Sequence, residues 1–220
     1  VAPMTNPTES SRSRGQVIVI DDDSSVRSSL RTMLERAGYD VMLYESADAF
    51  LQYPKVSMPA VLLLDMRMPG TLGVGLQAQL KSLDLDVPVI FVSGDSQPEE
   101  IILAMKQGAF DFLLKPFTAQ SMLDVIDSAM HASHRAVLVA DKTMKVSERL
   151  KRLTPREMEV CHWMVRGYSN QQIATIDGGA SATIKLHRAR VMDKMGAETL
   201  PDLINMLIGI DIPSPSIKSL

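Results

Sequence analysis

Five side chains able to do chemistry stand directly after short apolar runs in the first part of the chain: Asp21, Asp22, Asp65, Ser93 and Lys115. Carboxylates held close together remain ionised only when a cation shares their site. Hard oxygen ligands beside water favour Mg²⁺, and a hydroxyl with an ammonium group favours an anion such as a phosphoryl group. The residue types therefore predict a site where Mg²⁺ and a phosphoryl group meet.

The apolar runs must bring these side chains together, and their pattern is typical of buried strands that alternate with amphipathic helices. We expect five strands, at Val17–Ile20, Val41–Tyr44, Val61–Leu64, Val89–Val92 and Phe112–Leu114. In an open parallel sheet, residues at the carboxyl ends of the strands converge on one crevice. The sequence therefore predicts an α/β fold with a doubly wound, five-stranded parallel sheet that carries all five side chains at one edge.

The first helix is expected directly after the acidic run. Leu30 and Leu34 share one of its faces, while Ser24 can cap its start and Gly38 can end it in a left-handed conformation. A helix start also gives the run Asp21 to Asp23 a simpler explanation, as a solvated acidic turn. The polar side chains that follow the other strands favour the phosphoryl site over that alternative.

Four segments resemble the motifs of the receiver domain of two-component response regulators: VIDDD, LLLDMRMPG, VIFVSGD and DFLLKPF. The resemblance covers residues 17 to 130 and implies a flavodoxin-like receiver domain at residues 16–130. It implies that Asp65 accepts a phosphoryl group as a carboxylate nucleophile. It also implies that Asp22, Asp65 and the backbone carbonyl of Arg67 ligate Mg²⁺, while Asp21 holds a metal-bound water.

By the same resemblance, Lys115 neutralises a phosphoryl oxygen, Ser93 moves to hydrogen-bond that oxygen, and Gly94 leaves room for it. Phe112 takes the place of the family's switch aromatic, although a plain buried phenylalanine explains it equally well. The Lys115–Pro116 peptide bond is expected to be cis.

A second resemblance points to an enzyme. An apolar strand that ends in Asp21-x-Asp23, together with the segment GDSQPE, is similar to the haloacid-dehalogenase phosphatases. Those enzymes place their catalytic lysine before the late acidic motif, whereas Lys115 follows it here, and none of their motifs matches DMRMPG. We therefore favour a receiver that at most phosphorylates and dephosphorylates itself at Asp65.

The chain of 220 residues is long enough for two domains, each with its own core. Residues 1–15 are polar and rich in serine and proline, so we expect them to be disordered. No apolar run approaches the length of a membrane span, and the N-terminus lacks the apolar core of a secretory signal. The single cysteine, Cys161, can form no internal disulfide and is explained as a small core residue. These features predict a cytoplasmic protein with no membrane partner.

Residues 131–152 are expected to form a helical linker that continues the last receiver helix. Apolar residues recur there and just before it at helical spacing: Leu123, Ile126, Met130, Val137, Ala140 and Met144. This pattern leads to the hypothesis that two chains pair along the helix. His131 and His134 could share a metal ion, but a hydrated helix face is the simpler explanation.

Helix starts dominate the chain from Leu153 onward. Capping boxes lie at Thr154–Glu157 and Ser169–Gln172, and Thr199–Asp202 opens a last helix. The segments LTPREMEVCHWMVRGYSNQQIA and TIKLHRARVMDKMGAETLPDLI resemble the LuxR/FixJ helix-turn-helix family over residues 153 to 208. The resemblance implies an all-α, four-helix, LuxR-type DNA-binding domain at residues 153–220, and it makes the whole chain similar to a response regulator of the FixJ/NarL type.

The family's recognition helix corresponds to Ala182–Met195 and is expected to enter the major groove. Its expected core side consists of Ile184, Val191 and Met195. Its expected base-contacting side consists of Lys185, Leu186 and Ala189. The side chains expected to contact DNA phosphates are Thr183, His187, Arg188, Arg190, Lys194 and Asn170. A solvated basic helix face is the alternative explanation of this cluster.

The turn before that helix departs from the family pattern. Asp177, Gly179 and Ala180 stand where the family has leucine, isoleucine and a serine cap. We expect Gly178 and Gly179 to shorten the preceding helix and loosen the turn, at about 1 kcal/mol for each glycine inside a helix. Ser181 is expected to cap the recognition helix one residue late. A DNA-binding domain less rigid than its relatives is the expected result.

Taken together, these patterns predict a phosphorylation-dependent transcriptional regulator. The expected phosphoryl donor is a sensor histidine kinase, the expected cofactor is Mg²⁺, and the expected output is promoter DNA bound by a phosphorylated homodimer. The net charge is −3, but residues 1–130 carry most of the acid, with 17 acidic against 10 basic side chains. Residues 153–220 carry 7 of each, and only there can a basic face emerge, so the net charge does not exclude DNA binding. The alternative function is a phosphate sink or protein-interaction regulator whose helix-turn-helix no longer binds DNA well.

Overall fold

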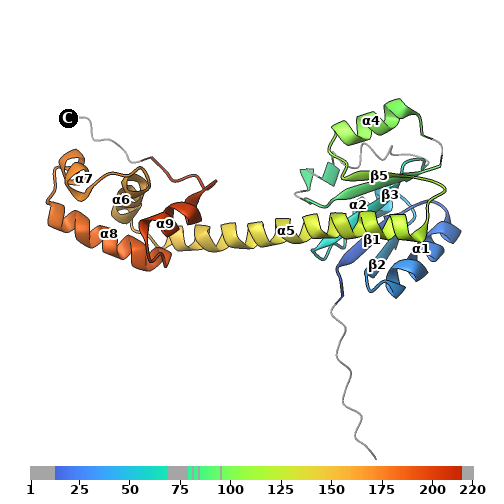
Figure 1. Cartoon of the computed structure of the whole chain (residues 1–220), viewed down its shortest axis with the longest axis horizontal. Coiled ribbons are helices and arrows are strands. Elements are labelled where there is room, and N and C mark those ends of the chain that lie inside the picture. Colours follow the sequence, from blue (N-terminus) through green and yellow to red (C-terminus); the bar gives the residue numbers. More distant parts are fainter. Residues whose placement is uncertain (1–12, 69–78, 81, 84, 95, 215–220) are drawn as a thin grey trace, which may run out of the picture. The chain divides into compact units, whose positions relative to one another are not determined.

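The computed structural model describes residues 13–68, 79–80, 82–83, 85–94 and 96–214 (Figure 1). The chain divides into two compact units, Val1–Val137 and Leu138–Leu220, and each has its own hydrophobic core. Among the described residues, no helix is both long enough and apolar enough to cross a membrane.

The first unit is built on a five-stranded parallel sheet with the strand order β2-β1-β3-β4-β5. The strands are β1 (Gln16–Ile20), β2 (Asp40–Tyr44), β3 (Ala60–Asp65), β4 (Val89–Ser93) and β5 (Asp111–Leu114). All five expected strands are present, each longer by one or two residues. The order places β1 beside β3, so that the residues at their carboxyl ends meet at one edge of the sheet. The predicted doubly wound α/β fold is confirmed.

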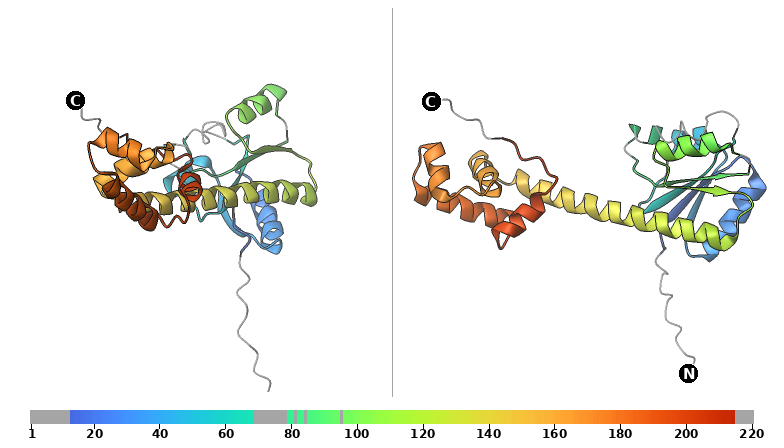
Figure 2. Two further views of the ribbon diagram at one scale, coloured as in Figure 1. Left: turned by 60° about the vertical axis from the view of Figure 1, so that its left-hand side comes forward. Right: turned by 45° about the horizontal axis from the view of Figure 1, so that its top comes forward.

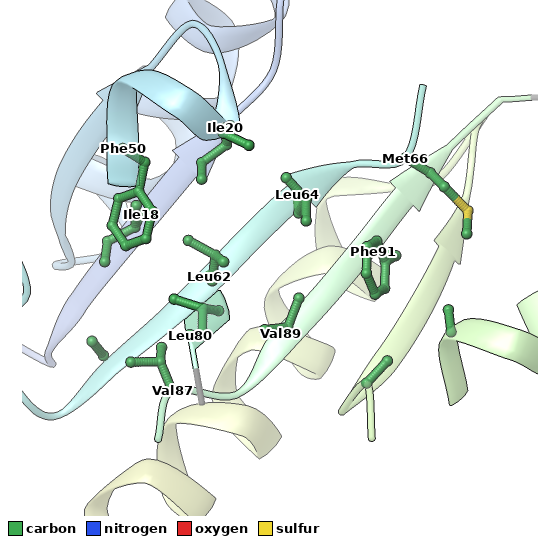
Figure 3. Packing of buried hydrophobic residues seen from close by; sticks show 14 residues of the cluster. Ile18, Ile20, Phe50, Leu62, Leu64, Met66, Leu80, Val87, Val89 and Phe91 are labelled. Carbon is green, nitrogen blue, oxygen red and sulfur yellow. The ribbon is translucent and has the colours of Figure 1, made fainter. Parts of the chain in front are cut away.

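Helices cover both faces of this sheet (Figures 1 and 2). They are α1 (Ser24–Arg36), α2 (Ala47–Gln52), α4 (Pro98–Lys106) and the first turns of α5 (Ala119–Lys151). On one face, Ile18 packs in a cluster with Phe50 of α2 (Figure 3). On the other face, Val19 packs in a second cluster with Leu34 of α1 and Ile126 of α5. Alternating side chains of each strand thus build two core layers, and these layers fix the positions of the strand ends.

Helix α1 begins at Ser24, one residue earlier than a Ser24 cap would require. Its N-cap is Asp23, whose carboxylate accepts hydrogen bonds from the backbone N–H groups of Ser25 and Val26. The prediction of Ser24 as the cap was therefore wrong, because the adjacent aspartate is an equally good cap. The end of the helix is as predicted, since Gly38 follows the last turn with a φ of +89°.

Arg14 and Gly15 were expected to lie in the disordered tail, but the structure fixes both. The Arg14 guanidinium lies 2.7 Å from the carboxylate of Asp127 on α5 and 4.9 Å from the ring centroid of Tyr39. The carbonyl of Gly15 accepts a hydrogen bond from the backbone N–H of Asp40. The tail prediction for residues 1–12 lies outside the described residues.

The second unit contains the end of α5 and four further helices: α6 (Pro155–Val165), α7 (Asn170–Asp177), α8 (Ser181–Met195) and α9 (Leu200–Leu207). Both predicted capping boxes are present, at Thr154 with Glu157 and at Ser169 with Gln172. Thr199 caps α9, also as predicted. The cysteine of the chain is fully buried in the core of this unit, which confirms that it packs as a small apolar residue.

Helix α5 runs without a break from Ala119 to Lys151. Near its start Ile126 lies in the core of the first unit, and near its end Val146 and Leu150 lie in the core of the second. Arg149 also donates a hydrogen bond of 2.8 Å to the carbonyl of Met195 at the end of α8. The residues expected to form a linker therefore include the last turns of α5, which are part of the second core.

The middle of α5 exposes both apolar and polar side chains. Leu138, Val139 and Met144 are each more than half exposed. His131 and His134 are exposed as well, as expected for a hydrated helix face. The pairing of two chains along this helix stays a prediction.

Candidate functional site

Three carboxylates meet at the carboxyl edge of the sheet. Oxygen atoms of Asp21, Asp22 and Asp65 lie within 4.8 Å of one another, and they form the one cluster of this kind among the described residues. Asp21 is buried, Asp65 is half-buried and Asp22 is exposed to solvent. An all-oxygen donor set with one open side fits Mg²⁺, which keeps several of its water ligands in proteins.

Lys115, at the end of β5, supplies the positive charge of this site. Its Nζ lies 2.8 Å from Oδ2 of Asp65 and 3.5 Å from Oδ2 of Asp21. Burial alone would lower the pKa of Lys115, but the hydrogen bond and charge of Asp65, with the charge of Asp21, raise it above its ordinary value. Lys115 is therefore protonated at neutral pH. The Lys115–Pro116 peptide bond is cis, as the sequence predicted.

The pKa of Asp21 is raised as well, but for this acid the shift disfavours the charged form. Burial raises the pKa of this carboxyl above its ordinary value, and the neighbouring Asp65 acts in the same direction. The backbone N–H of Asp23 and the ammonium of Lys115 offset part of this shift. A buried carboxyl of this kind gains from any further cation beside it.

The carboxylate of Asp65 is held on both oxygens. Oδ1 accepts a hydrogen bond of 2.9 Å from the backbone N–H of Arg67, and Oδ2 accepts one from Lys115. The Arg67 side chain lies 3.7 Å from the carboxylate of Glu100 on α4. The role of the Arg67 carbonyl as a metal ligand stays a prediction.

Ser93 ends β4 and lies deep in the site, with 1% of its surface exposed. Its Oγ accepts a hydrogen bond of 2.7 Å from Oγ of Ser96, a residue that the sequence analysis did not single out. A methyl group at Gly94 would lie 3.7 Å from Cβ of Lys115, which is ordinary contact, so Lys115 does not require a glycine there. Phe112 is half-buried and packs against the cluster of Ile18, and its switch role stays a prediction.

Helix α8 presents two different sides. Ile184, Val191 and Met195 are buried in the core, as predicted. Five residues of α8 that were predicted to contact DNA are exposed: Thr183, Lys185, Leu186, Ala189 and Arg190. Leu186 is 52% exposed and lies among the polar and basic residues of this side. An exposed helix side with basic groups around one leucine can meet both phosphates and a thymine methyl group.

Lys194 does not belong to that exposed side. Its Nζ lies 2.6 Å from Oε2 of the buried Glu157 and 3.1 Å from the carbonyl of Arg152. The ion pair ties α8 to the start of α6 and engages the ammonium group of Lys194, so that the expected contact of Lys194 with a DNA phosphate stays a prediction. The two partners are 37 residues apart in sequence, and no local pattern joins them.

Arg188 is also held inside the unit. Its Nη1 donates a hydrogen bond of 3.0 Å to the carbonyl of Tyr168, and burial lowers the pKa of its guanidinium. A contact of Arg188 with a DNA phosphate would therefore use its other N–H groups, and it stays a prediction. His187 and Asn170 are both half-buried, and their expected phosphate contacts stay predictions.

The turn between α7 and α8 is held by an ion pair that the sequence analysis missed. The carboxylate of Asp177 pairs with Arg156 of α6, which also bonds Glu159. Gly178 ends α7 in a left-handed conformation with a φ of +67°, a conformation that favours glycine. Neither Gly178 nor Gly179 lies inside a helix, so the expected helix penalty does not arise.

The start of α8 also differs from the prediction. Ala180 is its N-cap and makes no side-chain hydrogen bond, while Ser181 is already the first helical residue. The prediction that Ser181 caps the helix was therefore wrong. The helix begins with one fewer hydrogen bond than a serine cap provides.

Comparison with known proteins supports both units. Residues 17–127 match the response regulator receiver domain, and residues 151–207 match the bacterial regulatory proteins of the luxR family. The chain is 35% identical over 190 residues to nodulation protein W of Bradyrhizobium diazoefficiens, covering 86% of this chain and 84% of that one. It is 35% identical over 194 residues to the transcriptional regulatory protein FixJ of the same organism, covering 88% and 94%.

Solved structures agree with these relatives. The response regulator StyR shares 35% sequence identity with a TM-score of 0.77 and covers 88% of this chain and 98% of that one. Full-length FixJ from B. japonicum shares 34% identity with a TM-score of 0.56 and covers 89% and 97%. A receiver domain implies a sensor kinase as partner, and a luxR-type domain implies DNA. The chain therefore belongs to the two-component response regulators that carry a luxR-type helix-turn-helix domain, and it is a phosphorylation-dependent transcriptional regulator.

Proposed function

We propose that Asp65 accepts the phosphoryl group from the phosphohistidine of a sensor histidine kinase. The observation that supports this most directly is the ammonium of Lys115, which lies 2.8 Å from Oδ2 of Asp65. A carboxylate oxygen of Asp65 attacks phosphorus, the bond from phosphorus to the imidazole nitrogen breaks, and the imidazole leaves with that electron pair and takes up a proton. Lys115 then lies beside the new phosphoryl oxygens and balances their charge. The same step with a small phosphoryl donor is self-phosphorylation. In self-dephosphorylation, water attacks phosphorus, the bond from phosphorus to the Asp65 oxygen breaks, and the carboxylate and inorganic phosphate are released.

Mg²⁺ fits the acidic edge of the same site. Asp22, Asp65 and the carbonyl of Arg67 would hold the ion, and Asp21 would hold it through a water molecule. When bound, the ion supplies positive charge to the phosphoryl oxygens. Ser93, at the end of the neighbouring strand, then donates its hydroxyl hydrogen to one of those oxygens.

The proposed output is promoter binding by α8. Lys185, Leu186 and Ala189 face the base edges, while Thr183 and Arg190 contact phosphates on either side. His187, Asn170 and the free N–H groups of Arg188 complete the phosphate contacts. Promoter DNA lies in the cytoplasm, which is therefore where we propose that the protein acts.

We further propose that the phosphorylated protein is a homodimer joined at α4 and β5. Ile102 and Leu103 of α4 are 53% and 49% exposed, and Leu114 at the end of β5 is 54% exposed. Leu114 directly precedes Lys115 in the chain. A movement of Lys115 on phosphorylation would therefore change this apolar surface. Pairing would bring two α8 helices to two half-sites of one promoter.

The test is DNA binding by the full-length protein across a salt series, with Mg²⁺ and with or without beryllofluoride as the phosphoryl mimic. No promoter sequence is needed, because phosphate contacts alone give salt-dependent binding. We expect the mimic to tighten binding by roughly tenfold, as coupling of about 1.4 kcal/mol between two sites would give. The Asp65→Asn variant should show no tightening.

The matched control is Asp40→Asn, which removes the charge of an exposed carboxylate at the start of β2. The phosphorylation site lies at the opposite, carboxyl ends of the strands. It should respond to the mimic as the unchanged protein does. An equal response in Asp65→Asn would refute the role of Asp65. Absence of DNA binding in every state would favour the protein-interaction alternative.

A further inference from the structure

We propose that Ser96 holds the hydroxyl group of Ser93 in the unphosphorylated protein and thereby sets how readily the receiver switches. Oγ of Ser96 donates a hydrogen bond of 2.7 Å to Oγ of Ser93. Ser93 is only 1% exposed, so water cannot easily replace this partner. The proposal rests on the proposed function of Ser93 as the hydroxyl that moves to the phosphoryl oxygen of Asp65.

The second contact of Ser96 explains how the hydrogen bond can be released. Oγ of Ser96 also lies 3.3 Å from Sδ of Met66, the residue next to Asp65 in the chain. One hydroxyl group carries one hydrogen, so Ser96 donates either to Ser93 or to the sulfur, which is a weak acceptor. When Ser93 leaves, Ser96 can turn to Met66 and does not become an unpaired donor.

Two part-buried contacts of one small side chain thus connect the acceptor strand with the switch residue. Met66 is 6% exposed and its backbone N–H donates to the carbonyl of Val92, one residue before Ser93. Ser96 is a positioning residue in this arrangement, because it acts on Ser93 and not on the phosphoryl group. It stabilises the resting orientation of Ser93 over the switched one.

The Ser96→Ala variant removes the donor and should make switching easier. A net hydrogen bond in a protein shifts an equilibrium by about fivefold. We therefore expect full-length Ser96→Ala to bind beryllofluoride about fivefold more tightly than the unchanged protein in the presence of Mg²⁺. Binding is measured by titration with ¹⁹F NMR of the bound mimic.

Two further variants separate this role from a general effect on packing. Ser96→Thr keeps the hydroxyl group and should restore the affinity of the unchanged protein. In a Ser93→Ala background, adding Ser96→Ala should change nothing, because the group that it holds is gone. The matched control is Ser128→Ala, which removes an exposed serine hydroxyl that bonds only the carbonyl of its own helix at Asp124 and should leave the affinity unchanged.

The outcomes distinguish this proposal from the one on which it rests. If the unchanged protein binds the mimic and Ser96→Ala binds it equally or more weakly, the role of Ser96 is refuted while that of Asp65 stands. If Ser96→Ala tightens binding equally in the Ser93→Ala background, Ser96 does not act through Ser93. If the unchanged protein binds no mimic at all, both proposals fail together.

Discussion

Lys115 is the residue on which the charge balance of the phosphorylation site depends. Its ammonium group lies between two carboxylates, at 2.8 Å from Asp65 and 3.5 Å from Asp21. The three acidic side chains can therefore be held close together before a metal ion arrives, because part of their charge is already neutralised. The same ammonium is in position when a phosphoryl group reaches Asp65, so little rearrangement is needed at that moment.

Glu157 leads to a prediction about acid stability. The hydrogen bond from Lys194, together with one from the backbone N–H of Thr154, lowers the pKa of Glu157 from an ordinary 4.5 to about 2. A pKa lowered by folding stabilises the folded state fully above pH 4.5, and that stabilisation is lost as the pH falls towards about 2. The free energy of unfolding should therefore fall by at most about 3 kcal/mol over this pH range through Glu157. We expect the Glu157→Gln variant not to show this contribution to the pH dependence.

The measurement is urea unfolding of the full chain at several pH values, followed by the fluorescence of Trp163. This tryptophan is the only one in the chain and lies on α6, so it reports on the second unit. Glu198→Gln, at an exposed carboxylate of the same unit, should keep the pH dependence. An identical pH dependence in Glu157→Gln would contradict the prediction.

At the scale of helices and strands, the sequence predicted the features that depend on neighbouring residues and missed those that depend on contacts between distant residues. Strands and capping boxes depend on residues a few positions apart, so periodicity and cap residues located them to within one or two residues. The choice between Ser24 and Asp23 failed because both residues are good caps. The ion pairs of Glu157 with Lys194 and of Arg156 with Asp177 join residues that are far apart in the chain, and no local pattern predicts them.

The N-terminus of α8 leads to a prediction about helix capping. Ala180 has the extended backbone of an N-cap, with φ −88° and ψ 137°, but no side chain that can accept a hydrogen bond. Ala180→Ser should therefore stabilise the second unit by about 1 kcal/mol. Urea unfolding followed by Trp163 measures the change. Ser181→Ala should change the stability little, and a loss as large as the gain from Ala180→Ser would show that Ser181 is the cap after all.

The ion pair of Arg156 with Asp177 should hold the end of α7 in place of the apolar anchor that the family has there. Both side chains are partly exposed, at 34% and 22%, so a moderate coupling is expected. A double-mutant cycle with Arg156→Gln and Asp177→Asn should give a coupling of about 0.5 to 1 kcal/mol, and 1 M salt should reduce it. The free energy of unfolding is again read from Trp163.

An exposed ion pair on the same unit provides the control for this cycle. Lys145 and Asp141 of α5 lie 2.6 Å apart but are 64% and 45% exposed. Their coupling should be smaller, at about 0.3 kcal/mol. Equal couplings for the two pairs would mean that the ion pair of Arg156 with Asp177 stabilises the end of α7 no more than an exposed surface pair does.

At the scale of the whole molecule, α5 takes part in both cores. Its early residues, such as Ile126, are buried with the sheet of the first unit. Its last turns contribute Val146 and Leu150 to the core of the second unit, which therefore begins before the helix-turn-helix segment that resembles the family. The hydrogen bond from Arg149 to the carbonyl of Met195 adds a polar contact between the same turns and α8. We propose that the second domain starts within α5 and not at Leu153.

Two fragments test this boundary. A fragment of residues 138–220 keeps Val146, Leu150 and Arg149 with their partners, whereas a fragment of residues 153–220 exposes the apolar surface that they cover. Each buried valine or leucine side chain contributes about 1.5 to 3 kcal/mol, so the shorter fragment should be less stable by at least about 3 kcal/mol. Val146→Ala in the full chain should show part of the same loss, while Leu138→Ala, at a side chain 68% exposed, should show almost none. Equal unfolding free energies for the two fragments would place the boundary at Leu153, and the end of α5 would then be a linker that only rests on the domain.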